Sequence, residues 1–154
     1  MSRELRDALG HWATGVAIIT AQDEHGQHYG MTVNSFASVS LDPALVLWSI
    51  QQECDYSSVF DRGYCVNILG ADQSDSVWKF TKGSQAERFD GVSSHTLKSG
   101  RLALTDAIGH FDCQLHQRVP AGDHDILIGQ IVEFGTRDHP PVLFNRGQLS
   151  QIAG

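Results

Sequence analysis

The segment Tyr29-Gly-Met-Thr-Val-Asn-Ser-Phe-Ala-Ser-Val-Ser-Leu-Asp-Pro43 decides how the rest of the sequence is interpreted. Small polar side chains are interleaved in it with apolar ones, and the polar members are Thr32, Asn34, Ser35, Ser38 and Ser40. Hydroxyl and amide groups of this size leave the backbone accessible and can donate to and accept from a flat, heteroatom-rich ligand. The segment therefore predicts strand-like structure that either binds such a ligand or forms an ordinary strand pair with one polar face.

The segments around it predict further antiparallel strands. Residues 16–21 form a β-branched apolar run, and the turn at 23–26 returns the chain as a hairpin into the segment that begins at Tyr29. Residues 44–50 are almost wholly apolar, which is typical of a strand buried on both faces. Because strands outnumber helices and do not alternate with them, the sequence excludes a doubly wound α/β fold and predicts a mainly β, antiparallel barrel. Other strands are predicted at 64–69, 110–116, 126–134 and 142–144.

Short helices are predicted at the rim of the barrel. An apolar stripe at helical spacing begins at Leu5, with Ser2 as its N-cap and Gly10 as its stop, so an amphipathic helix should pack this stripe on a sheet. Asp72 is a suitable N-cap for a second helix over residues 73–80. Two further short helices are expected, one after the polar loop 51–58 and one within the irregular segment 81–100.

Composition restricts the possible function classes. The chain has 154 residues, of which 41% are hydrophobic and 19% charged, values typical of one globular domain that spans residues 1–154. Its net charge of −7 argues against a nucleic-acid partner, since binding a phosphate backbone needs a positive field. No apolar run approaches the roughly 20 residues needed to span a bilayer. Three widely spaced cysteines indicate a reducing compartment, so we expect a cytoplasmic protein without a membrane segment.

Several familiar catalytic and metal-binding patterns are absent from the sequence. It contains no Gly-x-Gly-x-x-Gly, no Gly-x-x-x-x-Gly-Lys-Ser/Thr and no Gly-x-Ser-x-Gly motif. His110 and His116 fall on one strand face, but at about 3.3 Å per residue they are roughly 20 Å apart, too far to bind one ion. We therefore predict no metal site, and we interpret Cys65 and Cys113 as buried structural thiols.

Four segments together resemble the flavin reductase-like family, the FMN-binding split barrels that serve two-component flavin monooxygenases. The longest is Gly-Met-Thr-Val-Asn-Ser-Phe-x-Ser-Val-Ser-Leu-Asp-Pro at 30–43, and the others are at 8–16, 64–69 and 122–129. The resemblance implies a Greek-key split β-barrel that forms a homodimer with flavin near the subunit interface. It also implies reduction of FMN or FAD with NADH or NADPH as hydride donor, the reduced flavin then passing to a partner monooxygenase.

The same resemblance implies where the flavin binds. The isoalloxazine ring would be edged by Thr32, Val33, Asn34 and Ser35. The ribityl chain would be contacted by Ser38, Val39 and Ser40. The phosphate would face Ser49, Ile50 and the loop from Cys54 to Ser57, with Lys79 or Lys82, or a residue of the other subunit, as a neutralising charge.

The resemblance also places His124 beside flavin and nicotinamide, as the catalytic residue. A neutral imidazole there would orient the nicotinamide carboxamide by a hydrogen bond, and an imidazolium would stabilise reduced flavin. Without the resemblance, His124 is also explained as a polar turn residue before a strand. Hydride transfer between two cofactors needs little acid–base chemistry from the protein, which explains why no catalytic triad or carboxylate pair stands out.

Three departures from the family pattern bear on these expectations. The loop 51–58 carries two acidic residues and neither Lys nor Arg, which is unfavourable beside a phosphate dianion. Asp125 follows His124 where Thr is common, and a carboxylate there would favour the imidazolium. Arg146-Gly147 lacks the Tyr that usually follows. The acidic loop keeps a second hypothesis open, a non-catalytic split-barrel protein that binds flavin or another planar cofactor.

Overall fold

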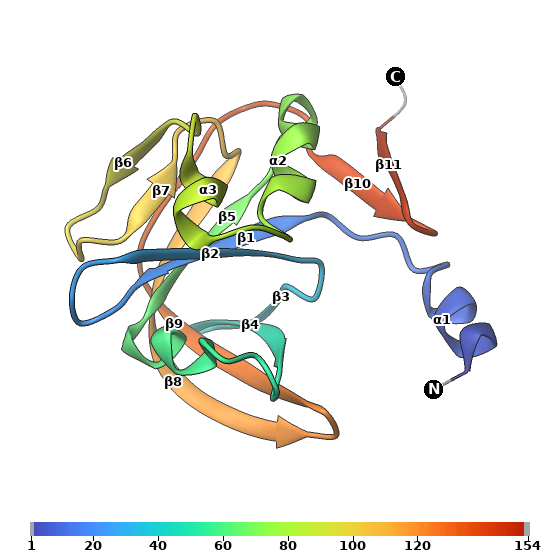
Figure 1. The fold of residues 1–154 in the computed structure, drawn as a ribbon, viewed down its shortest axis with the longest axis horizontal. Coiled ribbons are helices and arrows are strands. Elements are labelled where there is room, and N and C mark those ends of the chain that lie inside the picture. The colour runs from blue at the N-terminus through green and yellow to red at the C-terminus, as the bar shows by residue number, and fades with distance from the viewer. Residues whose placement is uncertain (1, 153–154) are drawn as a thin grey trace.

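An antiparallel sheet of seven strands forms the body of the molecule in the computed structural model, which describes residues 2–152 (Figure 1). The outermost strands follow each other in sequence through residues 34–36, and within residues 2–152 no β-ladder joins them, so the sheet forms a split barrel. This arrangement confirms the predicted mainly β, antiparallel fold. In sheet order the strands are β2 (His28–Val33), β1 (Ala17–Gln22), β5 (Tyr64–Ile68), β8 (Gly109–Ala121), β9 (His124–Thr136), β4 (Ala44–Gln51) and β3 (Ala37–Leu41).

Short helices and two small hairpins surround the barrel. The helices are α1 (Arg3–Leu9), α2 (Ser74–Lys79) and α3 (Gln85–Phe89), with 3-10 turns η1 (Ser57–Arg62) and η2 (Ala71–Gln73). The hairpins pair β6 (Ser94–Thr96) with β7 (Leu102–Leu104), and β10 (Val142–Asn145) with β11 (Gln148–Gln151). In Figure 1, α2 and α3 lie against the side of the sheet that β1 and β2 form, whereas α1 stands apart beside the β10–β11 hairpin.

Aromatic side chains fill the interior of the barrel. Trp48 of β4 is fully buried and meets Phe60 of η1 and Tyr64 of β5 edge-on, with ring centroids 5.0 and 5.4 Å away. Such edge-to-face pairs stabilise a core beyond the area that they bury. Along β4 the buried residues alternate with half-buried ones, so the prediction of a strand buried on both faces is wrong for one face. An apolar run alone does not distinguish a covered face from a half-covered one.

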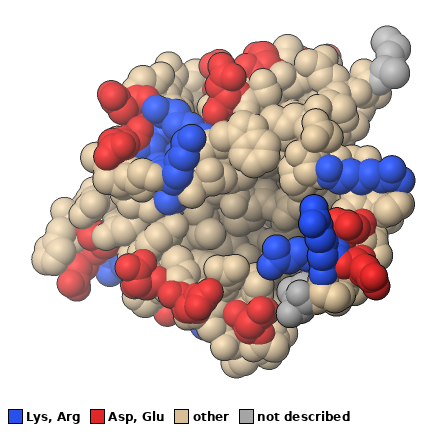
Figure 2. All heavy atoms as spheres, turned by 45° about the vertical axis from the view of Figure 1, so that its right-hand side comes forward, with Lys and Arg blue, Asp and Glu red and all other residues tan. Residues whose placement is uncertain are grey.

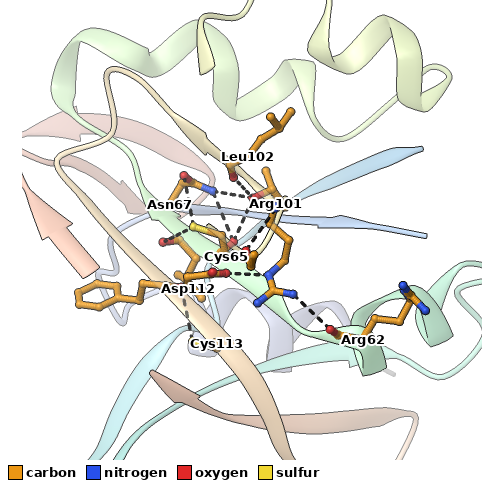
Figure 3. Close-up of polar contacts among 11 residues, drawn as sticks. Arg62, Cys65, Asn67, Arg101, Leu102, Asp112 and Cys113 are labelled. Carbon is orange, nitrogen blue, oxygen red and sulfur yellow. Dashed lines mark hydrogen bonds and ion pairs between the residues drawn. The ribbon is translucent and has the colours of Figure 1, made fainter. Parts of the chain in front are cut away.

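A buried polar network ties β7 to the barrel, as Figure 3 shows. The Asn67 side chain donates to Thr20 Oγ1 at 3.1 Å, and its Oδ1 accepts from Leu104 N at 2.8 Å. Beside it, Arg101 Nε donates to Asp112 Oδ1 at 2.7 Å, with the two side chains 11% and 1% exposed. Since buried polar groups cost free energy unless they are paired, this network helps to determine how the β6–β7 hairpin docks.

Two thiols lie in the same region of the core. Cys65 and Cys113 are fully buried and free. Burial raises the pKa of the Cys65 thiol well above its usual range and raises the pKa of Cys113 to about 12. Both therefore stay protonated at neutral pH, which confirms the interpretation of these residues as structural thiols.

Helix α1 has the predicted extent but not the predicted packing. Ser2 caps it by accepting a hydrogen bond from Leu5 N at 3.1 Å, and the helix ends at Gly10. None of its residues is buried, and Leu9 and Trp12 are 64% and 80% exposed. The expectation that the apolar stripe packs on a sheet is therefore wrong, because periodicity identifies an apolar face without identifying what covers it.

The second helix begins later than predicted, and Asp72 does not cap it. Asp72 lies inside η2, where its carboxylate is 3.4 Å from both Arg137 and His139. The helix α2 begins at Ser74 without a side-chain cap, because a tight 3-10 turn precedes it and Gln73 Oε1 accepts from Gly70 N instead. The predicted short helices before Gly63 and around Ala86 are present as η1 and α3, while β6, β7 and β11 were too short for their pattern to be detected.

Candidate functional site

A cleft of about 430 Å³ opens at the split of the barrel, where β2 and β4 end. Eight of the residues predicted to bind cofactor or act in catalysis line it together, although they come from positions spread between 32 and 124 in the sequence. These eight are Thr32, Val33, Asn34, Ser35, Ser49, Ile50, Cys54 and His124. The other residues of the lining are Met31, Gln51, Glu53, Asp55 and Tyr56.

Five predicted residues lie outside this lining. Ser38, Val39 and Ser40 belong to β3, whose residues are mostly exposed, and a register shift interrupts its pairing with β4 between the two serines. Ser57 begins η1 and is held by Arg118, while the backbone carbonyl of Lys82 accepts from Arg88. Contacts of these five residues with a bound flavin stay predictions.

Two hydroxyls of the cleft are already engaged with the protein. Ser35 Oγ accepts from Ser49 N at 2.9 Å, a bond that connects the segment 34–36 to β4 across the split. Thr32 Oγ1 donates to Val77 O at 2.6 Å and so ties β2 to α2. The Asn34 side chain makes no hydrogen bond with any residue in the range 2–152, so its amide can both donate to and accept from a ligand. Among these polar residues, Asn34 has the freest hydrogen-bonding groups.

His124 stands at the start of β9, directly after the turn of the β8–β9 hairpin. Its Nδ1 lies 2.7 Å from Asp123 Oδ1, and this hydrogen bond is the main reason that the pKa of Asp123 is lowered. A carboxylate only accepts hydrogen bonds, so Nδ1 carries the proton. The other nitrogen, Nε2, is then an acceptor in the neutral ring and becomes a donor only when the ring is protonated.

The carboxylate beside this histidine is not the one that the sequence suggested. Asp125 instead accepts from Arg118 Nη1 at 2.9 Å and from Gln52 Nε2 at 3.0 Å. These two bonds lower the pKa of Asp125 against the opposing effect of burial. The expectation that Asp125 would act on His124 is therefore wrong, because adjacent residues of a strand point to opposite faces.

Arg118 is a cation behind the loop 51–58 that the sequence analysis missed. Its guanidinium donates to Ser57 Oγ at 3.0 Å, to Asp61 Oδ1 at 2.8 Å and to Asp125. Burial opposes its charge, but the hydrogen bonds to the two carboxylates outweigh burial and raise the pKa of Arg118. No pattern in the sequence places Arg118 there, because its partner Ser57 is 61 positions away.

A second and larger hollow, of about 1090 Å³, adjoins the cleft. Both Asn34 and His124 line it, so the two spaces meet at these residues. Its other side is formed by Arg6 of α1, by Trp12 in the segment that follows this helix, and by Arg146 in the turn between β10 and β11. Figure 2 shows the face hollowed near its centre, with Lys and Arg side chains at the upper left and at the right. These local cations contrast with the net charge of −7.

The described part of the chain contains neither a metal-binding cluster nor a membrane-spanning helix. Within residues 2–152, no three His, Cys, Asp or Glu side chains are grouped so that they could hold a metal ion. In the same range, no helix is long and apolar enough to cross a membrane.

The fold and the cleft together define a split-barrel protein with a polar cleft at the open edge of its sheet. Comparison with known proteins makes this more specific. The family model of the flavin reductase like domain matches residues 9–153. FMN reductase (NADH) SmoA of Agrobacterium fabrum is 36% identical over 154 residues, covering 99% of this chain and 87% of that protein.

Two further relatives are similar to this chain over most of its length. The reductase component of the flavin-dependent trigonelline monooxygenase of Acinetobacter baylyi is 38% identical over 147 residues, covering 94% of this chain and 47% of that protein. The structure of the NADH:FAD oxidoreductase SgcE6 of Streptomyces globisporus C-1027, in complex with NAD and FAD fragments, has a TM-score of 0.91 at 29% identity and covers 97% of this chain and 92% of that one. The chain belongs to the flavin reductase-like domain family, and it is an NAD(P)H:flavin oxidoreductase.

Proposed function

We propose that the cleft at the split binds the isoalloxazine ring of FMN or FAD and that nicotinamide stacks on this ring beside His124. The observation that carries the proposal is that eight of the residues predicted from the family resemblance line one cleft. The donor set fits a flavin, because a ring edge that presents both donors and acceptors is matched by the free amide of Asn34.

The flavin and the nicotinamide supply the redox chemistry, a hydride passing from nicotinamide to flavin. This chain positions the two rings and limits the access of water. The Ser35–Ser49 bond holds the cleft at its width, and His124, oriented by Asp123, presents Nε2 to the space where the two hollows meet. The larger hollow, with Arg6 and Arg146, would take the phosphates of a dinucleotide.

The finer expectations remain part of this proposal. The reduced flavin would pass to a partner monooxygenase, as the names of relatives suggest for those proteins. The uncovered apolar residues of α1 and of the segment that follows it, among them Leu9 and Trp12, support a homodimer, since exposed apolar surface of this kind is typical of an interface. A cytoplasmic location stays a prediction.

The test is a turnover matrix of purified protein with FMN or FAD and with NADH or NADPH. We expect flavin-dependent oxidation of at least one nicotinamide nucleotide. Glu53 and Asp55 line the cleft near the expected phosphate position, and this observation favours the second candidate, a flavin-binding protein without turnover. Flavin that copurifies and is not reduced by either nucleotide would support that candidate and contradict the proposal.

Replacing Asn34 with alanine is expected to raise the KM for flavin several-fold, because the only groups it removes are a free donor and a free acceptor in the cleft. Ser35→Ala should have a similar effect through the loss of the bond to Ser49 N. Steady-state kinetics with varied flavin measures both. Gln117→Ala, an exposed amide on β8 outside the cleft, is the control. Unchanged kinetics in both variants would remove this assignment.

Replacing His124 with alanine is expected to lower kcat/KM for the nicotinamide nucleotide about tenfold, the effect of one lost hydrogen bond of average strength to the reacting complex. The KM for flavin should change less, because the expected contact is with nicotinamide. His116→Ala is a matched control, since His116 is an exposed residue of the neighbouring strand β8. A selective rise of the flavin KM in His124→Ala would contradict the assigned role.

A further inference from the structure

Arg88 of α3 is a buried arginine whose hydrogen-bond partners are all uncharged. Only 9% of the residue is exposed. The two protons of Nη1 are shared among three acceptors, Gly30 O at 2.8 Å, Phe80 O at 3.1 Å and Tyr56 Oη at 3.2 Å, and Nε donates to Lys82 O at 3.2 Å. These bonds join β2, the end of α2 and the loop 51–58, so the guanidinium is fixed in place.

The charge of Arg88 has no counter-charge. Within residues 2–152, no carboxylate oxygen lies within 4.0 Å of its guanidinium, whereas the other well-buried guanidinium, that of Arg101, is paired with Asp112. Buried charges are normally paired, since desolvation costs several kcal/mol per ion. Nη2 has no hydrogen-bond partner in this range either, and it is not sealed from solvent. Arg88 therefore has unused capacity for an anion.

Tyr56 connects Arg88 to the cleft. Tyr56 lines the cleft, and its ring is held between those of Tyr29 and Phe60, with centroids 5.6 and 6.2 Å away. Because its Oη accepts from Arg88 Nη1, the hydroxyl proton remains free to be donated in another direction. A hydroxyl that accepts from a guanidinium is polarised, which strengthens the bond that it donates to an anion.

The loop 51–58 contains no cationic residue of its own. It has neither Lys nor Arg, and its Glu53 and Asp55 line the cleft. Arg118, behind the loop, already donates to the carboxylates of Asp61 and Asp125. The uncompensated positive charge that is bonded to a residue of the cleft is that of Arg88.

We propose that Arg88 and Tyr56 form an anion anchor that binds the 5′-phosphate of the flavin. Tyr56 donates its hydroxyl proton to a phosphate oxygen, and Arg88 provides the charge that compensates both the phosphate dianion and the two acidic residues of the loop. The inference rests on the proposed flavin site and adds to it the group that recognises the phosphate. It also explains how the loop 51–58 can lack a basic residue.

The test compares FMN with riboflavin, which has the same ring and ribityl chain but no phosphate. Equilibrium titration by flavin fluorescence gives the Kd of both ligands for the wild-type protein, Tyr56→Phe, Arg88→Lys and Arg88→Met. We expect wild-type protein to prefer FMN and Tyr56→Phe to weaken FMN binding about tenfold while the Kd of riboflavin stays unchanged. Arg88→Met should abolish the preference, and Arg88→Lys should restore part of it.

Tyr29→Phe is the matched control, because it removes a neighbouring phenol whose hydroxyl is directed at Asp23 and is not part of the cleft lining. It should keep the full preference for FMN. If Tyr56→Phe weakens FMN and riboflavin equally, or if the wild-type protein does not prefer FMN, the anion anchor is overturned while the flavin site stands. If the wild-type protein binds neither flavin, the proposed function itself fails. If Arg88→Met does not fold, the Kd values of FMN and riboflavin for Tyr56→Phe are sufficient to test the anion anchor.

Discussion

Replacing Asp112 with alanine is expected to destabilise the protein by about 3 to 5 kcal/mol, since it leaves the charge of Arg101 buried without a partner. A loss of this size is a large fraction of the roughly 5 to 15 kcal/mol that holds an ordinary domain folded. The measurement is urea unfolding followed by tryptophan fluorescence, supported by Tm. A loss below about 1 kcal/mol, the range of surface pairs, would contradict the importance of this pair.

Two controls distinguish the effect of leaving a buried charge unpaired from the effect of removing any carboxylate that contacts an arginine. Asp61→Ala removes a carboxylate that also contacts an arginine, Arg118, but that is 48% exposed, so it should cost less than about 1 kcal/mol. The double variant Asp112→Leu with Arg101→Met removes both charges and should recover most of the loss, because an apolar pair of similar volume is often as stable as a buried ion pair.

Gly129→Ala is expected to cost about 1 to 3 kcal/mol by overpacking the barrel interior. A Cβ at this position would collide with the hydroxyl of Tyr64 and lie 3.0 Å from Cys113 Cβ. The ring of Tyr64 cannot move away easily, because Trp48 packs edge-on against it. Thermal unfolding of the variant measures the effect, and a Tm equal to that of the wild-type protein would contradict it.

Gly15→Ala is the control for this substitution, since a Cβ there would have no heavy atom within 4 Å. It should leave stability unchanged or raise it slightly, because alanine restricts the unfolded chain. Adding Tyr64→Phe to Gly129→Ala should restore part of the lost stability by removing the colliding hydroxyl. The hydrogen bond that the Tyr64 hydroxyl donates to Leu127 O is long, 3.5 Å, so little is lost with it.

Features that depend on neighbouring residues could be predicted from the sequence. The Ser2 cap, the hairpin of β1 and β2 and the strand β5 all follow from patterns within a few residues. The split barrel and the residues of the cleft were predicted because an extended motif, not a single pattern, resembled a family. Eight of those residues do lie together in one cleft.

Features that depend on distant residues were not predicted. Arg118 meets Ser57 across 61 positions and Arg88 meets Gly30 across 58, and no local pattern specifies such pairs. The prediction that α1 packs on a sheet was wrong for the same reason. Its apolar stripe could be identified from the sequence, but the residues that lie around the helix could not. The sequence therefore located the polar residues of the cleft better than the charges around it, which depend on which strands become neighbours in the barrel.

The lack of any buried residue in α1 has a practical consequence for measuring ligands. Helix α1 is followed by Gly10, whose carbonyl accepts from Arg146 N at 2.9 Å and from the Asn145 side chain at 3.3 Å in the β10–β11 hairpin, and a helix tethered in this way should exchange its amide hydrogens for deuterium early. Its exchange rate therefore starts from a high baseline, and a nucleotide that occupies the adjoining hollow would slow it. Residues 3–9 would then act as a built-in reporter of occupancy that needs neither a label nor turnover.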